Sequence, residues 1–342
     1  MVFGGRAKGQ GSGYGGGLGE REIIELIKKR LDVLPRSFLP FGDDISAVAL
    51  DEGRVAVLKT DMLVGKTDVP RGMSWWQAAR KAVVMNVSDF AAKGVQPKAA
   101  LVSLGLRRGL LHRDIDEIGR GLNAGAREYG AYIIGGDTGE ASDFVIAVTL
   151  FGTAERKRLM LRTGAKAGDV VAVTGFFGKS AAGLRILQDG YAASEDLREV
   201  LLGSVFMPQA RLKEGLAMAG SFAVTSSVDS SDGLAWSLHE LSKMSGVGFL
   251  ISSVPVADEV KSFADFNGLD ALELALNSGE EYELVVTVKP KLWGEAEVVV
   301  ERVGGVLLPI GKVIREKKVV LELGGKRRLV EPRGWEHFKS KA

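Results

Sequence analysis

Aspartate residues recur where the apolar pattern of a predicted strand or helix stops. They stand in short polar blocks spread along the chain: Asp43 with Asp44, Asp61, Asp89, Asp137, and Asp229 with Asp232. If these carboxylates converge in the folded chain, their mutual repulsion raises their pKa values unless a cation is present. Mg²⁺ suits such a site best, because it accepts a few carboxylates, keeps several waters and bridges phosphate oxygens. The pattern therefore predicts a magnesium site suited to phosphate chemistry.

Each aspartate also has a purely structural interpretation. Asp232 caps a helix in that interpretation, Asp89 pairs with a lysine one helical turn away, and Asp61 merely ends a strand. The collective pattern favours function. Asp61 shares a strand face with Val55 and Val57, so we expect its carboxylate near the edge of the core.

Composition excludes several other chemistries. The chain has no cysteine, which rules out disulfides, thiolate metal sites and a cysteine nucleophile. Its three histidines stand at no metal-ligand spacing, which argues against a zinc enzyme. Gly178-Lys179-Ser180 follows a predicted strand, but the first glycine of a phosphate-binding P-loop would fall at Val173, so that motif fails.

Charge and hydropathy bound the partners. The 45 basic and 43 acidic residues leave a net charge of +2, which gives no broad positive field for nucleic acid or an anionic membrane. The sequence contains neither a long apolar run nor a signal-peptide pattern, so we expect a cytoplasmic protein.

The elements that must position the aspartates alternate between helical and strand patterns. Apolar periodicity predicts helices over 20–31, 74–93 and 114–129, and strands over 46–50, 54–59, 99–106, 131–134 and 144–151. In the helix over 74–93, Asn86, Asp89 and Lys93 lie along the border of the apolar face, which predicts half-buried surroundings for them.

A second mixed region follows a break in the apolar pattern over 154–169. It contains predicted helices near 180–188, 208–219, 234–245 and 290–303, and predicted strands over 170–173, 223–228, 283–288, 307–314, 319–323 and 326–330. We therefore predict an α/β (α+β) protein with domains over 20–155 and 156–342, after a flexible glycine-rich tail over 1–19.

The polar blocks, taken together, resemble the thiamine-monophosphate kinase family, whose superfamily includes aminoimidazole ribonucleotide synthetase and selenophosphate synthetase. The similarity covers nearly the whole chain from Glu20 onward. It is carried by seven blocks in order: Gly42-Asp-Asp, Thr60-Asp-Met-Leu-Val, Asn86-Val-Ser-Asp, Gly135-Gly-Asp-Thr, Arg162-Thr-Gly-Ala-Lys-Ala-Gly-Asp, Asp229-Ser-Ser-Asp-Gly-Leu and Gly279-Glu-Glu-Tyr-Glu-Leu. One block is a weak signal, whereas seven in order are specific.

The resemblance implies a role for particular residues. The implied metal-binding positions are Asp44, Thr60, Asp61, Asp89, Asp137, Asp229 and Asp232, of which Asp89, Asp229 and Asp232 belong to the catalytic centre. The implied nucleotide contacts are Gly136, Asp137, Arg162 and Ser231, and the implied acceptor contacts are Asp68, Glu280 and Trp335. Many relatives carry histidine at the position of Asp68, and aspartate at that of Glu281. Trp335 has an equal alternative as an aromatic anchor for the C-terminal tail.

The resemblance also implies a two-domain synthetase-like fold, a homodimer whose N-terminal domains share a β-barrel, and phosphorylation of thiamine monophosphate by ATP with several Mg²⁺ ions. A phosphate monoester is already an anionic nucleophile, so no general base is required and repulsion between two polyanions is the main obstacle. Two alternatives stay open. They are an enzyme similar to aminoimidazole ribonucleotide synthetase and a nucleotide-binding regulator without turnover.

Overall fold

The computed structural model describes residues 19–32, 34, 38–39 and 42–338, and the chain divides into two units. One unit comprises 1–35 and 336–342, and its described part contains α1 (Glu20–Lys28). The Glu20 carboxylate at the start of α1 accepts the backbone N–H of His337 at 3.2 Å. The other unit, 36–335, contains both β-sheets. Apart from Gly19, the predicted glycine-rich tail lies outside the described residues.

The first sheet has five strands in the order β1-β2-β5-β3-β4. The strands are β1 (Ser46–Ala49), β2 (Arg54–Val64), β3 (Pro97–Leu106), β4 (Tyr132–Glu140) and β5 (Val145–Glu155). The predicted hairpin of β1 and β2 is confirmed. β2 runs five residues beyond its predicted end, because its pairing with β5 continues to Val64. Asp61 therefore lies within a strand, and the expectation that it ends one was wrong.

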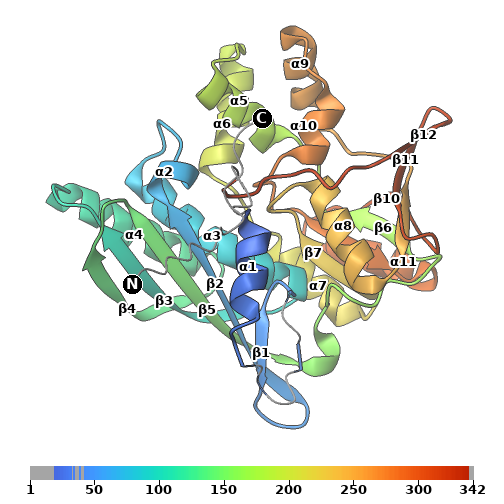
Figure 1. Ribbon diagram of the computed structural model, residues 1–342, viewed down its shortest axis with the longest axis horizontal. Coiled ribbons are helices and arrows are strands. Elements are labelled where there is room, and N and C mark those ends of the chain that lie inside the picture. The colour runs from blue at the N-terminus through green and yellow to red at the C-terminus, as the bar shows by residue number, and fades with distance from the viewer. Residues whose placement is uncertain (1–18, 33, 35–37, 40–41, 339–342) are drawn as a thin grey trace, which may run out of the picture. The chain divides into compact units, whose positions relative to one another are not determined.

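Helix α3 (Trp75–Lys93) crosses the interior of this unit, between the two sheets (Figure 1). Ser74 caps it: its hydroxyl accepts the Gln77 N–H, and the Gln77 side chain accepts the Ser74 N–H. α3 packs on β2 and β5 with one side and on α4 (His112–Glu128), α7 (Leu212–Ser221) and β7 (Val224–Asp229) with others. Asp89 and Lys93 are consequently buried, not half-buried as predicted.

The second sheet has seven strands in the order β12-β11-β8-β10-β6-β9-β7. The further strands are β6 (Val170–Val173), β8 (Gly248–Ile251), β9 (Leu284–Val288), β10 (Leu308–Ile314), β11 (Val319–Leu323) and β12 (Lys326–Leu329). Helix α8 (Leu234–Ser245) packs on this sheet, whereas α11 (Trp293–Arg302) packs on α7. The mixed α/β class with two sheets is confirmed.

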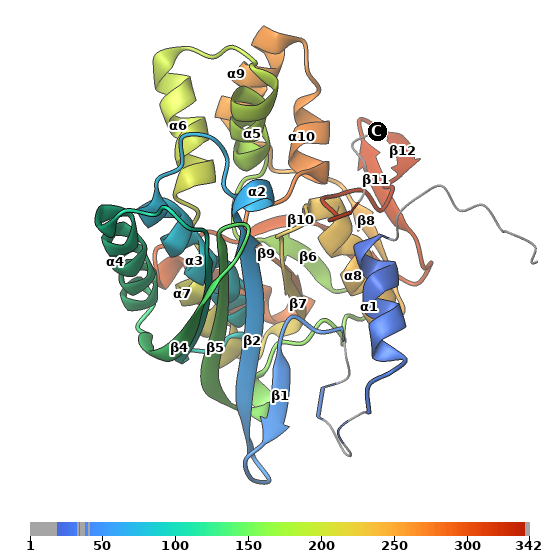
Figure 2. The ribbon, with the colours of Figure 1, turned by 60° about the vertical axis from the view of Figure 1, so that its left-hand side comes forward.

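Four helices form a separate group with its own apolar core: α5 (Lys179–Asp189), α6 (Glu195–Phe206), α9 (Asp258–Asn267) and α10 (Ala271–Asn277). Figure 2 shows them together at the top of the view. Three of the four, α6, α9 and α10, were not predicted, and neither was β8.

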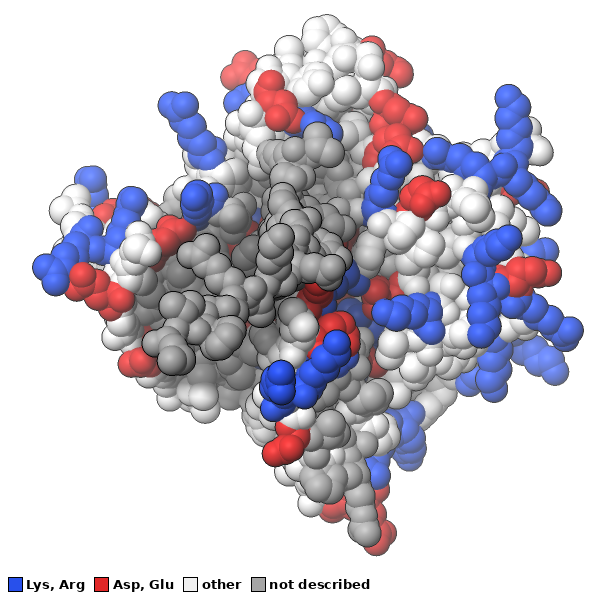
Figure 3. All heavy atoms as spheres, in the orientation of Figure 1, with Lys and Arg blue, Asp and Glu red and all other residues white. Residues whose placement is uncertain are grey.

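The two sheets use separate stretches of chain, the first ending at Glu155 and the second beginning at Val170. Residues 36–335 nevertheless pack as one unit, so the domain division at 155/156 and the shared barrel of a dimer stay predictions. Within the described residues, no helix combines the length and apolar character needed to cross a membrane. Figure 3 shows acidic and basic side chains interspersed over the described part of one face.

Candidate active site

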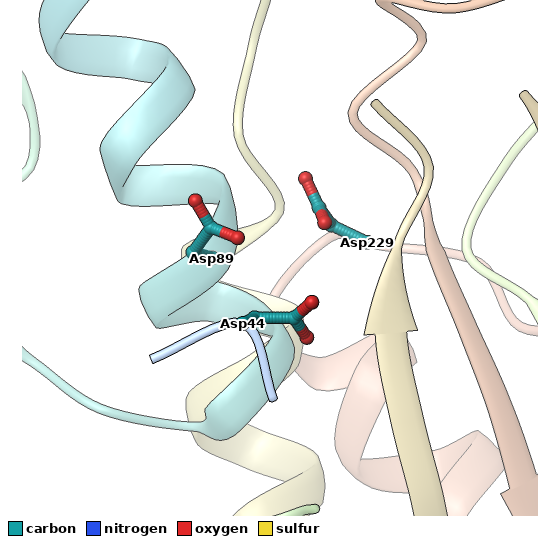
Figure 4. A group of neighbouring side chains, drawn as sticks. All are labelled: Asp44, Asp89 and Asp229. Atoms are coloured by element: carbon teal, nitrogen blue, oxygen red, sulfur yellow. The ribbon is translucent and has the colours of Figure 1, made fainter. Parts of the chain in front are cut away.

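Three predicted metal ligands converge although they are far apart in the sequence. Carboxylate oxygens of Asp44, Asp89 and Asp229 all lie within 4.8 Å of one another, and all three residues are buried. Asp44 precedes β1, Asp89 lies on α3 and Asp229 ends β7, and Figure 4 shows the three side chains gathered where these segments meet. We call these residues the carboxylate cluster. Hard oxygen donors at this separation match the ligand chemistry of Mg²⁺.

The block Asn86-Val-Ser-Asp places successive side chains against different segments. The Asn86 side-chain oxygen accepts the backbone N–H of Asp61 at 2.9 Å, which ties α3 to β2. The Ser88 hydroxyl donates to Asp229 Oδ2 at 2.7 Å, which ties α3 to β7. Side chains of α3 thus fix the positions of Asp61 on β2 and of Asp229 at the end of β7 relative to Asp89.

Two lysines and an arginine enter the site. Lys93 Nζ lies 2.8 Å from Asp43 Oδ1 and 2.7 Å from Asp44 Oδ2, and Lys59 Nζ lies 3.0 Å from both Asp61 Oδ1 and Asp89 Oδ2. The sequence reasoning did not assign either lysine to the site. For Lys59 a signal was present, since it stands two residues before Asp61 and therefore on the same strand face.

Arg162, predicted to contact the nucleotide, is bound to the same aspartates. Its Nε donates to Asp44 Oδ1 at 2.7 Å, its Nη2 also bonds this oxygen, and its Nη1 donates to the Gly42 carbonyl at 2.9 Å. Its backbone N–H donates to Asp43 at 3.1 Å. Arg162 therefore lies beside the cluster, and its guanidinium nitrogens are bound to Asp44, the Gly42 carbonyl and Glu240.

The pKa values in the cluster diverge according to the available cations. Burial raises the pKa of Asp229 to about 7, the Asp44 charge adds to this, and the Ser88 hydrogen bond opposes it. Burial likewise raises the pKa of Asp89 well above its usual range, although Lys59 opposes this effect. Burial would also raise the pKa of Asp44, but Arg162 and Lys93 outweigh it and lower that pKa. The cations of the chain therefore outweigh the effect of burial at Asp44 but not at Asp89 or Asp229.

Other predicted residues lie elsewhere in this chain. The Thr60 hydroxyl accepts from Thr149 at 3.1 Å on the face of the sheet opposite Asp61. Asp137 is exposed on the edge strand β4. Across the sheet it is in register with Ser103, Ala147 and Met62, so its side chain lies on the same outward face as that of Met62. Gly136 lies beside Asp137 on the same strand. The structure does not bring the Thr60 or Asp137 side chains to the carboxylate cluster.

The predicted acceptor residues Asp68 and Glu280 meet at one buried lysine. Lys81 Nζ donates to the Asp68 carbonyl at 3.1 Å and lies 2.5 Å from Glu280 Oε1. The Asp68 carboxylate itself accepts the Val64 N–H at 2.7 Å. Glu280 has φ of +65°, an uncommon conformation for a non-glycine residue, and strained residues of this kind are enriched at functional sites.

Three loops are tied together by backbone hydrogen bonds. The Ser231 carbonyl accepts the Glu280 N–H at 2.7 Å, and the Asp232 carbonyl accepts the Trp335 N–H at 3.0 Å. Both approaches require glycine. A Cβ at Gly279 would lie 2.3 Å from the Ser231 carbonyl oxygen, and a Cβ at Gly334 would lie 2.2 Å from the Asp232 carbonyl oxygen. Ser231, Asp232 and Trp335, all predicted from the sequence, thus lie in neighbouring loops at the end of β7.

A cavity of about 500 Å³ adjoins Glu280. Its wall includes Phe176, Met207 and Arg211, together with Glu281 and Glu283. The cavity lies near the cluster in the sheet. Leu284 on β9 pairs with Asp229, and the residue before it, Glu283, is part of the cavity wall. The sequence reasoning did not identify the cavity.

Comparisons with known proteins agree on one family. The sequence model of "AIR synthase related protein, N-terminal domain" matches residues 42–154. The thiamine-monophosphate kinase of Nitrosopumilus maritimus is 34% identical over 325 residues, covering 94% of this chain and 99% of that protein. The thiamine-monophosphate kinase of Pyrococcus horikoshii is 36% identical over 325 residues, covering 94% and 96%. The solved structure "AaThiL complexed with AMPPCP and TMP" is similar at TM-score 0.81 and 31% identity, covering 93% of this chain and 97% of that one.

Proposed function

Because the chain belongs to the thiamine-monophosphate kinase family, we propose that it transfers the γ-phosphoryl group of ATP to the phosphate of thiamine monophosphate. The products are ADP and thiamine diphosphate. The observation that carries this proposal is the convergence of Asp44, Asp89 and Asp229 within 4.8 Å, next to the Arg162 guanidinium. The similar structure bound to AMPPCP and TMP supports both substrates.

Magnesium is part of this proposal. Asp44, Asp89 and Asp229 fit the ion, because all three are buried carboxylates and the cations of the chain do not offset the effect of burial at Asp89 and Asp229. Asp61 lies next to them through Lys59. When bound, the ions would neutralise phosphate charge and orient the phosphates for in-line transfer. We propose Asp232 as a further ligand. Thr60 and Asp137 are also proposed as ligands, but of a site that only a second copy of the chain would complete.

The chain's own residues position and screen the reacting groups. An attacking phosphate monoester needs no general base, so the protein has to overcome charge repulsion and fix the geometry. Arg162 supplies a guanidinium beside the cluster, and Lys81 holds Asp68 and Glu280 at the proposed acceptor side. Ser231 links the cluster to the proposed acceptor side, because it lies two residues after Asp229 and its carbonyl accepts the Glu280 backbone N–H.

A homodimer is the proposed assembly. The face of the first sheet that turns away from α3 carries exposed apolar side chains, among them Leu58 and Met62 on β2 and Leu101 on β3. An apolar sheet face of this kind typically packs against a partner. Dimerisation through it would also cover Thr60 and Asp137, which lie on this face. We propose the cytoplasm as the location, since the reaction consumes ATP.

Phosphorus NMR tests the reaction directly. The protein is mixed with ATP, MgCl₂ and thiamine monophosphate, and the spectrum is followed for a new diphosphate signal that grows together with ADP. Unphosphorylated thiamine serves as the control acceptor and should give no diphosphate ester. Nucleotide binding without product formation would contradict the proposal and favour a regulator.

A further inference from the structure

Lys59 is a cation within the site that the proposed reaction does not by itself require. It lies on β2 two residues before Asp61, so both side chains project from the same face of the sheet. Its Nζ lies 3.0 Å from Asp61 Oδ1 and 3.0 Å from Asp89 Oδ2. The ammonium group therefore joins a carboxylate on a strand to a carboxylate of the cluster on α3.

Lys59 differs from Lys93 in how its ammonium group is satisfied. An ammonium has three N–H donors. Lys93 is fully buried and has three acceptors, since it also donates to the Ser227 carbonyl at 2.7 Å. Lys59 has two acceptors in the described part of the chain, and its side chain is 19% exposed. The ammonium group of Lys93 is thus fully used by the fold, whereas that of Lys59 is partly exposed.

The cations are distributed unevenly around the cluster. Arg162 and Lys93 both serve Asp44, on one side of the cluster. On the other side Lys59 bridges Asp61 and Asp89, and among the residues described Asp229 has no ion pair. A position between two carboxylates is one that a bridging divalent ion takes in an oxygen-ligand site. An ion and an ammonium group cannot share it, because two positive charges in contact repel strongly.

We propose that Lys59 is a resident cation of the metal site: its ammonium group takes the position of one divalent ion between Asp61 and Asp89. The chain then binds one ion fewer than the same cluster with a neutral side chain at position 59. This inference rests on the proposed metal-dependent kinase function. Its physical advantage is that a covalently attached charge holds Asp61 and Asp89 together before any ligand arrives.

Counting bound Mn²⁺ tests the inference without relying on turnover. Free Mn²⁺ is measured by electron paramagnetic resonance during titration of the full chain with AMPPCP present. Lys59→Met, which keeps the length of the side chain and removes its charge, should bind one more Mn²⁺ per chain than the wild type. Lys59→Arg, which keeps the charge, should bind the wild-type number. Lys98→Met is the matched control, because Lys98 lies on the same sheet and donates to Thr153, away from the site.

A second measurement uses thermal unfolding with and without metal. Lys59→Met should melt at a lower temperature than the wild type in EDTA and should gain more from added Mn²⁺. If this variant and Lys59→Gln fold only with Mn²⁺, the inference is supported; if neither folds even with Mn²⁺, Lys59 is a structural residue and the inference fails. An unchanged Mn²⁺ count in folded Lys59→Met also overturns it. Wild-type protein that binds no Mn²⁺ would instead defeat the proposed metal site itself.

Discussion

Asp89 lies at the point where the charges of the site are least balanced. Its carboxylate is part of the buried cluster and bonds to Lys59, which also serves Asp61. Burial raises its pKa well above the usual range, and the charges of Asp229 and Asp61 raise it further against the effect of Lys59. A buried carboxylate with a strongly perturbed pKa, grouped with two others, is a candidate functional position.

Replacing this charge should separate activity from stability. Asp89→Asn keeps the side-chain volume and removes a ligand charge, so we expect turnover to fall by at least about a hundredfold, the order seen when one preorganised group is lost. The melting temperature in EDTA should stay at or above that of the wild type, because the amide avoids a buried charge. Asp116→Asn, on the exposed side of α4, should change neither quantity. Near-normal activity of Asp89→Asn would remove Asp89 from the proposed site.

At the residue scale, the sequence indicated which side chains lie inside the fold better than it indicated their partners. Strand alternation placed Asp61 toward the core correctly, and helical periodicity placed Asp89 beside the apolar face. The same alternation turns Thr60 and Asp137 outward, a consequence that block-by-block resemblance does not reveal. Lys93 was interpreted only as a border residue. Its contacts with Asp43, Asp44 and Ser227 depend on segments more than 40 residues away, and local patterns carry no information about them.

At the element scale, Glu281 fixes the start of α5 beside the cavity. Its Oε1 accepts from the Gly178 N–H at 2.7 Å, the Ser180 N–H at 3.3 Å and the Ser180 hydroxyl at 2.9 Å. Burial raises the pKa of Glu281 to about 7, above its ordinary value of 4.5, and the hydrogen bonds offset this only in part. The loop over 279–283 is therefore joined to the helix group through a carboxyl group that prefers to be neutral.

This preference predicts how stability depends on pH. The folded state retains a proton that the unfolded chain releases, so the free energy of unfolding falls as pH rises from about 4.5 to about 7, by at most about 3 kcal/mol. Glu281→Gln keeps an acceptor oxygen and cannot ionise. Its stability relative to the wild type should therefore increase across this pH window and level off above it. Urea denaturation in EDTA at several pH values measures this difference.

The control for this experiment is Glu295→Gln, an exposed position at the start of α11. Its curve of stability against pH should run parallel to that of the wild type. If the Glu281→Gln curve is also parallel, then Glu281 is not protonated preferentially in the folded state. Asp229 contributes a decline of the same sign to all of these proteins, so only the difference between curves reports on Glu281.

The elements missing from the sequence prediction share a physical reason. Helices α6, α9 and α10 bury only short stretches, such as Leu201 and Val205 of α6, against one another. Their apolar faces are completed by neighbouring helices rather than by one long stripe, so the periodic signal in each is weak. Strand β8 spans only four residues. α3 and α8, with long apolar faces, were predicted closely.

At the scale of the whole molecule, the described residues cover the first sheet on one face only. α3 packs on the inner face, whereas Met62 and Leu101 on the outer face are 56% and 50% exposed. β4 adds an edge strand whose residues are exposed throughout. Long exposed edges and apolar faces favour association with another chain. The resemblance predicted pairing of N-terminal domains from family knowledge, and the outer face gives that prediction a location.

Introducing charge on this face should therefore separate the proposed dimer. Light scattering coupled to size-exclusion chromatography should give twice the mass of one chain for the wild type and a single-chain mass for Leu101→Lys. A lysine there would lose its hydration when the two apolar faces pair, so association is opposed. The fold should persist, because Leu101 is half exposed, and circular dichroism verifies this. Leu329→Lys, on the exposed strand β12 of the second sheet, is the matched control and should leave the dimer intact. A wild-type protein that stays monomeric at every concentration would contradict the proposed assembly, and with it the completion of the site by Asp137 of a second copy.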